Sequence, residues 1–195
     1  FFAFLRDPVA RFRSQYLNRS PSHTEQAFDE WASGKWTHNW QTRMIAGEPN
    51  AEKAIDIIGH RVGFIGLTER FDESVVMLGE WLGEPGFRGE YRPANQLKKK
   101  RRPRDLARER TDMSYLKTDR VRARMAEINA EDQKVYDFVT STVFPQQVAA
   151  HRESLPSKVE ALQQRCREAG LLMESLWANF YRNFIYEPLV ACHAM

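Results

Sequence analysis

The stretch that decides the fold is FFAFLRDPVARFRSQY, residues 1–16. Its first five residues are apolar and rich in aromatic side chains, which is typical of a short buried strand. Asp7 belongs to the residue types that cap helix N-termini, and Pro8 suits the first helical position, where its missing N–H costs nothing. The stretch therefore predicts a strand that passes directly into a helix, with Arg6 at the carboxyl end of the strand.

Arg6 and Ser14 flank this predicted junction. A guanidinium offers a charge-assisted fork to an anion, and a serine hydroxyl adds a neutral donor. Two interpretations stay open at this point. In the first, both side chains converge on a bound anion; in the second, Arg6 pairs with Asp7 or Glu69 and the serine is ordinary helix surface. Arg11, on the same helix, is expected to brace the helix against neighbouring carboxylates.

The first ninety residues alternate between strand and helix patterns. A second apolar run at 62–67 has the length and glycine content of a short buried strand, and 71–83 carries apolar side chains at helical spacing. The polar and aromatic segment 34–50, which holds Gln41 and Arg43, predicts a loop. Such alternation predicts an α/β fold in which helices flank a parallel sheet core.

The later part of the chain has a helical character. Asn129 can cap a helix with Asp132 in its first turn, and a strong apolar stripe runs from Val135 to Phe144. Another amphipathic helix is expected after Ser157. We therefore predict one domain over residues 1–150 and a helical carboxyl-terminal tail over 151–195 that packs on it.

Positive charge gathers in one short run of an otherwise mildly charged chain. The net charge of the 195 residues is +3, yet residues 98–110 hold eight basic side chains against two acidic ones. Such a run attracts phosphate, sulfate or acidic polymers, although charge runs are most often solvated loops. No aromatic residues interleave with it and no helix-turn-helix or RNA-stacking signature surrounds it, which disfavours nucleic acid as the partner.

Composition also limits the other classes of function. No segment has the eighteen or more apolar residues that a membrane span requires. The two cysteines have no metal-ligand spacing, the histidines are scattered, and no metal is expected.

The opening stretch resembles a sulfotransferase element. FLRDPVARFRSQY is similar to the arginine-x-proline-x-x-arginine-x-x-serine element of the sulfotransferase family that includes the heparan sulfate 2-O-sulfotransferases and bacterial relatives. Four further segments resemble that family in order along the chain, over roughly residues 1–150. They are HNWQTRMIAG (38–47), VGFIGLTERFDESVVML (62–78), YRPANQLKKKRRP (91–103) and NAEDQKVYDF (129–138).

This resemblance implies a P-loop NTPase-like sulfotransferase fold that transfers a sulfuryl group from 3′-phosphoadenosine 5′-phosphosulfate to a hydroxyl, most plausibly of a carbohydrate. By resemblance, Arg6 and Ser14 bind the 3′-phosphate of this donor, and Lys98 and Lys99 belong to a basic loop that folds over the nucleotide. Gln41 and Arg43 would lie near the acceptor, and their substrate contact stands beside a purely structural role.

The family also holds the phosphosulfate in a glycine-rich lysine-bearing loop, which the 195 residues do not contain. We expect that loop and the catalytic base upstream of Phe1, so that the fold is incomplete at its amino end and this fragment alone is inactive. A non-catalytic interaction module on the same fold and a basic nucleic-acid-binding protein are the alternatives. The expected compartment is the cytoplasm for a bacterial protein and the Golgi lumen for a eukaryotic one, and no oligomeric state is predicted.

Overall fold

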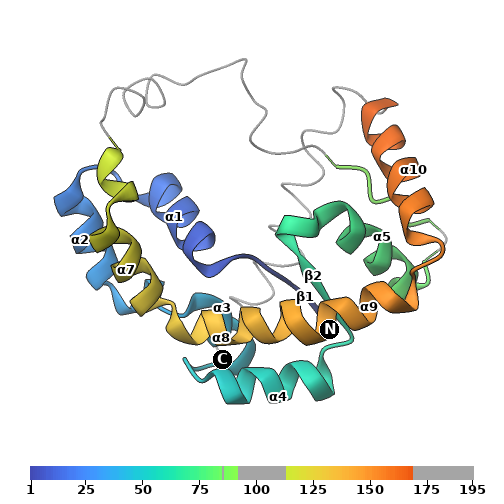
Figure 1. Ribbon diagram of the computed structural model, residues 1–195, viewed down its shortest axis with the longest axis horizontal. Coiled ribbons are helices and arrows are strands. Elements are labelled where there is room, and N and C mark those ends of the chain that lie inside the picture. The colour runs from blue at the N-terminus through green and yellow to red at the C-terminus, as the bar shows by residue number, and fades with distance from the viewer. Residues whose placement is uncertain (85, 92–112, 169–195) are drawn as a thin grey trace. The chain divides into compact units, whose positions relative to one another are not determined.

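The computed structural model describes residues 1–84, 86–91 and 113–168 of the chain (Figure 1). These fall into two compact units, the first built from 1–69 and the described part of 99–146, the second from the described parts of 70–98 and 147–195. The first unit contains β1 (Phe2–Leu5), α1 (Pro8–Arg19), α2 (Glu25–Ser33), η1 (Lys35–Thr37), α3 (Trp40–Ala46), α4 (Ala51–Arg61), β2 (Phe64–Leu67), η4 (Ser114–Lys117), α7 (Asp119–Ile128), α8 (Ala130–Phe138) and the π-helical η5 (Val139–Val143).

The sheet of the first unit consists of β1 and β2, which pair in parallel with Phe2 opposite Phe64 and Leu5 opposite Leu67 (Figure 1). All four residues of β2 are buried. Gly66 is required there, because a Cβ at this position would lie 2.5 Å from the ring of Phe4. Since both strands run the same way, their carboxyl ends meet at one edge of the sheet. The described fold is thus mostly helical with a small parallel sheet, which is compatible with the predicted α/β class.

An aromatic core fixes α1 against α2 and α7. The ring of Phe28 packs edge-on against Phe12 at 6.2 Å and against Tyr16 at 5.6 Å between ring centroids. The hydroxyls of Tyr16 and Tyr115 lie 2.8 Å apart, and burial raises the pKa of Tyr16 above its ordinary value. The completely buried rings at α1 hold the helix, and with it the junction at Arg6, in one position.

The second unit is built around α5 (Phe71–Leu82) and α10 (Leu155–Glu168), which pack against each other, together with the end of α9 (Phe144–Ala150). Glu80 on α5 forms ion pairs with His151 and Lys158. The hydroxyl of Tyr91 donates to the carboxylate of Asp72. The helix predicted after Ser157 is present as α10, whereas a boundary at residue 150 between a domain and a tail stays a prediction.

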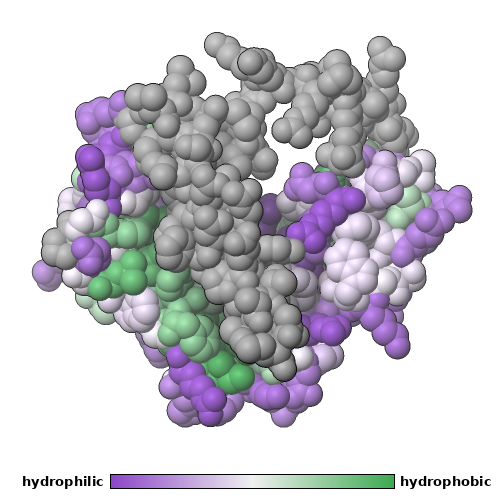
Figure 2. All heavy atoms as spheres, turned by 180° about the vertical axis from the view of Figure 1, so that it is seen from behind, coloured by the Kyte–Doolittle hydropathy of each residue, from purple (hydrophilic) through white to green (hydrophobic). Residues whose placement is uncertain are grey.

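A few large apolar side chains reach the surface. Figure 2 shows hydrophobic residues on one face among hydrophilic ones. Trp36 packs edge-on against Trp31, with ring centroids 4.9 Å apart. Scattered exposed apolar residues are normal in folded proteins. The most exposed large ones in the described ranges are Phe1, Trp36, Trp81 and Leu82.

The predicted loop at 34–50 is wrong. This segment contains η1 and α3, so Gln41 and Arg43 lie on a helix. A seven-residue helix of this kind is too short to be stable on its own. It forms because residues far away in the sequence cap it, which no local pattern reveals.

Candidate anion-binding site at the carboxyl ends of the strands

Asp7 and Pro8 form the predicted junction between β1 and α1. The carboxylate of Asp7 accepts a hydrogen bond of 2.7 Å from the backbone N–H of Ala10, and Pro8 opens the helix. This confirms the predicted cap. It also means that the Asp7 carboxylate already occupies the start of α1, where backbone amides would otherwise face a ligand.

Gln41 holds the backbone of Arg6 from both sides. Its carboxamide oxygen accepts from the Arg6 N–H at 2.9 Å, and its amide nitrogen donates to the Arg6 carbonyl at 2.9 Å. The residue is 5% exposed. This contact gives Gln41 a structural role that the sequence left open, while substrate binding by the same side chain stays a prediction.

The side chain of Arg6 is left available by these contacts. Among the described residues, its guanidinium makes no ion pair or hydrogen bond. The interpretation that pairs Arg6 with Asp7 or Glu69 is therefore wrong. The Asp7 carboxylate binds the start of α1, and Glu69 accepts the Asp7 N–H at 2.9 Å. The junction thus presents a half-buried cation whose local carboxylates are used elsewhere.

Ser14 lies further along the same helix. It is six positions after Pro8, which places it about 9 Å further along the axis of α1. Its hydroxyl accepts from the Asn18 amide at 3.4 Å, so its own hydrogen remains available as a donor. Arg6 and Ser14 make no hydrogen bond with each other in the described structure.

Glu69 and Tyr136 stand at the same edge of the sheet. Glu69 follows β2 in η2 (Thr68–Arg70), and the hydroxyl of Tyr136 on α8 hydrogen-bonds to it. Burial, followed by the nearby Glu69 and Asp7 charges, raises the pKa of Tyr136 to about 12. The phenol is therefore a neutral donor at physiological pH. In the sequence this tyrosine lies within the apolar stripe and the resembling segment 129–138, and nothing local indicated that it faces the junction.

Asp132 ties α8 to α3 and α1. This carboxylate is 1% exposed and accepts from the backbone N–H of Thr42 at 2.7 Å and of Gln41 at 3.2 Å. The Nε of Arg11 lies 3.8 Å from it. This contact with a carboxylate confirms the predicted bracing role of Arg11. The Arg11 guanidinium also donates to the Asn129 side chain at 3.0 Å. Sequence reasoning placed Asp132 only in the first turn of its helix and missed that it caps another one.

Asn39, at the start of α3, in turn caps the start of α8. It adopts the left-handed conformation, with φ of 46°, and its side-chain oxygen accepts from the N–H groups of Glu131 at 2.9 Å and Asp132 at 3.3 Å. Asn129 is the N-cap residue of α8, as predicted, but its side chain makes no capping hydrogen bond, and its amide donates to the Met125 carbonyl at 2.7 Å instead. The starts of α3 and α8 therefore cap each other.

The remaining predicted site residues lie apart from the junction or outside the description. Arg43 is exposed on α3 and donates to the Lys35 carbonyl at 3.2 Å. Lys98 and Lys99 lie outside the described residues. Within the described ranges, no group of three or more His, Cys, Asp or Glu side chains is arranged to hold a metal ion. Nor does any helix there combine the length and apolar character needed to cross a membrane.

Comparison with known proteins identified no relative of this chain. No protein-family model, curated protein or solved structure matches the chain. The geometry at Arg6 and the sequence motifs are therefore what a function must be inferred from.

Proposed function

We propose that the carboxyl edge of β1 and β2 binds the 3′-phosphate of 3′-phosphoadenosine 5′-phosphosulfate, and that this chain is part of a sulfotransferase of P-loop NTPase-like fold. In this proposal the acceptor is a hydroxyl of a carbohydrate. One observation carries the proposal. Arg6 has a backbone clasped on both sides by Gln41 and a guanidinium without a partner among the described residues.

The position of Arg6 supports an anion ligand. Ligands of α/β proteins bind outside the carboxyl ends of parallel strands, and Arg6 directly follows β1. Because the backbone is already fixed, less conformational entropy is lost when the guanidinium engages a phosphate. A phosphate also accepts from several donors at once, so Ser14 can add a second contact to the same group or to a neighbouring oxygen.

The site differs from a helix N-terminus that binds phosphate. The first amides of α1 are satisfied by Asp7, whose negative charge would repel an anion placed there. Recognition must therefore come from the side chains of Arg6 and Ser14, at a distance from the Asp7 carboxylate. This makes the expected affinity sensitive to one arginine.

The reaction implied by the donor explains why such a site matters. The acceptor oxygen attacks sulfur in line and forms a new O–S bond, a base takes the hydroxyl proton, and the bond between sulfur and the phosphate oxygen breaks. Adenosine 3′,5′-bisphosphate leaves. Positioning and electrostatics dominate such transfers, as in phosphoryl transfer. Arg6 would bind and orient the donor through its 3′ end, and we assign no base among these residues.

Nucleotide binding by the 195-residue chain tests the proposal. Calorimetry should show tighter binding of adenosine 3′,5′-bisphosphate than of adenosine 5′-monophosphate, which lacks the 3′-phosphate. Arg6→Ala should weaken bisphosphate binding by about 1.5–3 kcal/mol, or roughly 10- to 150-fold, the range for a hydrogen bond to a charged group.

Arg13→Ala is the matched control, because this arginine is exposed on the same helix and its loss changes the net charge equally. It should leave the affinity within about twofold of the parent, as expected for a screened surface charge. Equal affinity for the two nucleotides, or full affinity in Arg6→Ala, would refute the phosphate site and leave a non-catalytic interaction module as the better account.

A further inference from the structure

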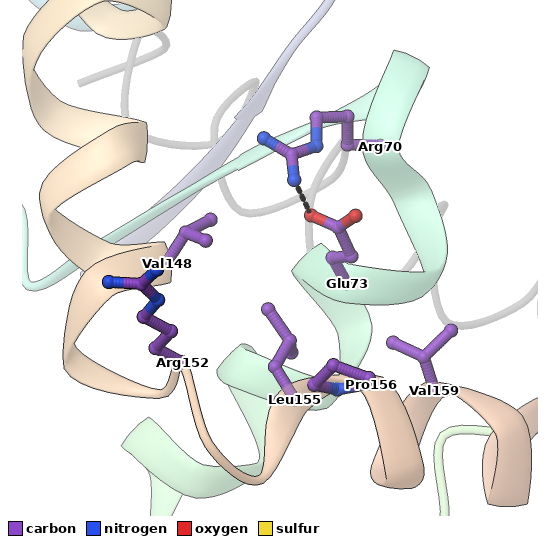
Figure 3. Close-up of a pocket in the computed structure, with 7 residues that line it drawn as sticks. All are labelled: Arg70, Glu73, Val148, Arg152, Leu155, Pro156 and Val159. Atoms are coloured by element: carbon purple, nitrogen blue, oxygen red, sulfur yellow. Dashed lines mark ion pairs between the residues drawn. The ribbon is translucent and has the colours of Figure 1, made fainter.

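A cavity of about 330 Å³ lies in the second unit, between the start of α5, the turn after α9 and the start of α10 (Figure 3). Its volume is at the lower end of the range for small-molecule sites. The apolar part of its wall is formed by Val148, Leu155, Pro156 and Val159.

Three charged side chains complete the wall, and one of them has no partner among the described residues. Arg70 forms an ion pair with Glu73, as Figure 3 shows. Arg152 lies beside Val148 at another edge of the cavity, and its side chain makes no ion pair or hydrogen bond within the described residues. Two arginines against one glutamate leave the lining with one net positive charge.

A second cavity in the same unit provides a comparison. It has a similar volume of about 340 Å³ and is also lined by basic side chains. There, however, Arg88 and Arg165 both pair with Glu90, and Lys158 pairs with Glu80. Each cation of this second cavity thus already has a carboxylate partner in the protein, whereas Arg152 of the first cavity has none among the described residues.

We infer that the first cavity binds a small monocarboxylate with an apolar body. The carboxylate meets the Arg152 guanidinium, whose planar fork matches two carboxylate oxygens. The apolar body covers Leu155 and Val159 and removes their exposed surface from water. A dianion would leave one charge unmatched, and a neutral or cationic ligand would leave Arg152 without a partner. The site uses no residue of the proposed nucleotide site and goes beyond that function.

Hexanoate is a suitable probe, with hexanol and hexylamine as its neutral and cationic counterparts. Saturation-transfer NMR and calorimetry on the 195-residue chain at neutral pH should detect hexanoate, with weaker binding of hexanol and none of hexylamine. Arg152→Gln should weaken hexanoate about tenfold, the equivalent of one charge-assisted contact, and leave hexanol unchanged. Val159→Phe, which fills the cavity, should weaken both ligands.

Arg167→Gln is the matched control, because this arginine is on α10, does not line the cavity and contacts only Gln164 within its own helix among the described residues. It should bind hexanoate as the parent does. Circular dichroism establishes that each variant is folded. Any of three results would overturn the inference. They are a folded parent chain that does not bind hexanoate, equal affinity of the parent for hexanoate and hexanol, and unchanged hexanoate affinity in Arg152→Gln. Bisphosphate binding should be the same in all these variants, which separates this test from that of the nucleotide site.

Discussion

Removal of the Asp132 carboxylate tests how the site is held together. Its two oxygens accept from the N–H groups of Gln41 and Thr42, and its charge lies 3.8 Å from the Arg11 Nε. In Asp132→Ala both amides lose their partner in a buried environment, at about 1–2 kcal/mol each. Loss of the charge opposite a largely buried guanidinium adds about 1 kcal/mol, well below the full cost of a broken buried pair, because Arg11 keeps other partners.

The expected loss is therefore about 3–5 kcal/mol of the free energy of unfolding, a large fraction of what a domain of this size has. Urea unfolding followed by tryptophan fluorescence and by circular dichroism measures it. Asp132→Asn keeps one acceptor oxygen and should lose roughly half as much.

Asp137→Ala is the control, since this aspartate is exposed on the same helix and accepts only from Gln133 among the described residues. It should change the stability by no more than about 0.5 kcal/mol. If Asp132→Ala unfolded at the same urea concentration as Asp137→Ala, the carboxylate would not be the cap that holds α3, and the account of the site would fail.

Three further predictions concern the sheet and its edge. Gly66→Ala places a Cβ 2.5 Å from the Phe4 ring and should destabilise the chain by about 1–3 kcal/mol, whereas Gly59→Ala, with nothing within 4 Å in a helix, should stabilise it by up to about 1 kcal/mol in urea unfolding. The pKa of Tyr136 is about 12 in the folded chain against an ordinary 10, so this residue contributes stability below pH 10 that is lost as the pH rises towards 12. The alkaline unfolding of Tyr136→Phe should lack this pH-dependent loss of stability. Gln41→Ala should weaken adenosine 3′,5′-bisphosphate binding several-fold without altering the preference for the 3′-phosphate. Unchanged affinity would show that the two hydrogen bonds from Gln41 to the Arg6 backbone do not organise the site.

The local signals of the opening stretch were sufficient to predict its structure. A short apolar run, a capping aspartate and a proline act within a few residues of one another, and β1, the Asp7 cap and the start at Pro8 follow them. The apolar run at 62–67 likewise became β2, and the helical spacing after residue 70 became α5. Parallel pairing of the strands agrees with the predicted alternation of strand and helix.

Other features were beyond sequence reasoning because their causes are distant in the chain. Helix α3 depends on Asp132, 90 residues from Thr42, and α8 depends on Asn39 in return. Glu131 similarly accepts the Ala51 N–H at 3.0 Å and so caps α4. Each of these residues looks like an ordinary polar side chain locally. Only the packing of α8 against α3 and α4 brings donor and acceptor together.

These distant caps also determine how the candidate site works. The Arg6 guanidinium is available because Gln41 fixes its backbone, and Gln41 is in place because Asp132 binds the backbone at the start of α3. The proposed anion binding would thus be coupled to the packing of α8, although α8 contributes no predicted ligand. A loss of nucleotide affinity in a variant of α8 would therefore reflect a displaced Arg6 and not a lost contact to the ligand. The two causes can be distinguished, because a displaced Arg6 is accompanied by a lower free energy of unfolding.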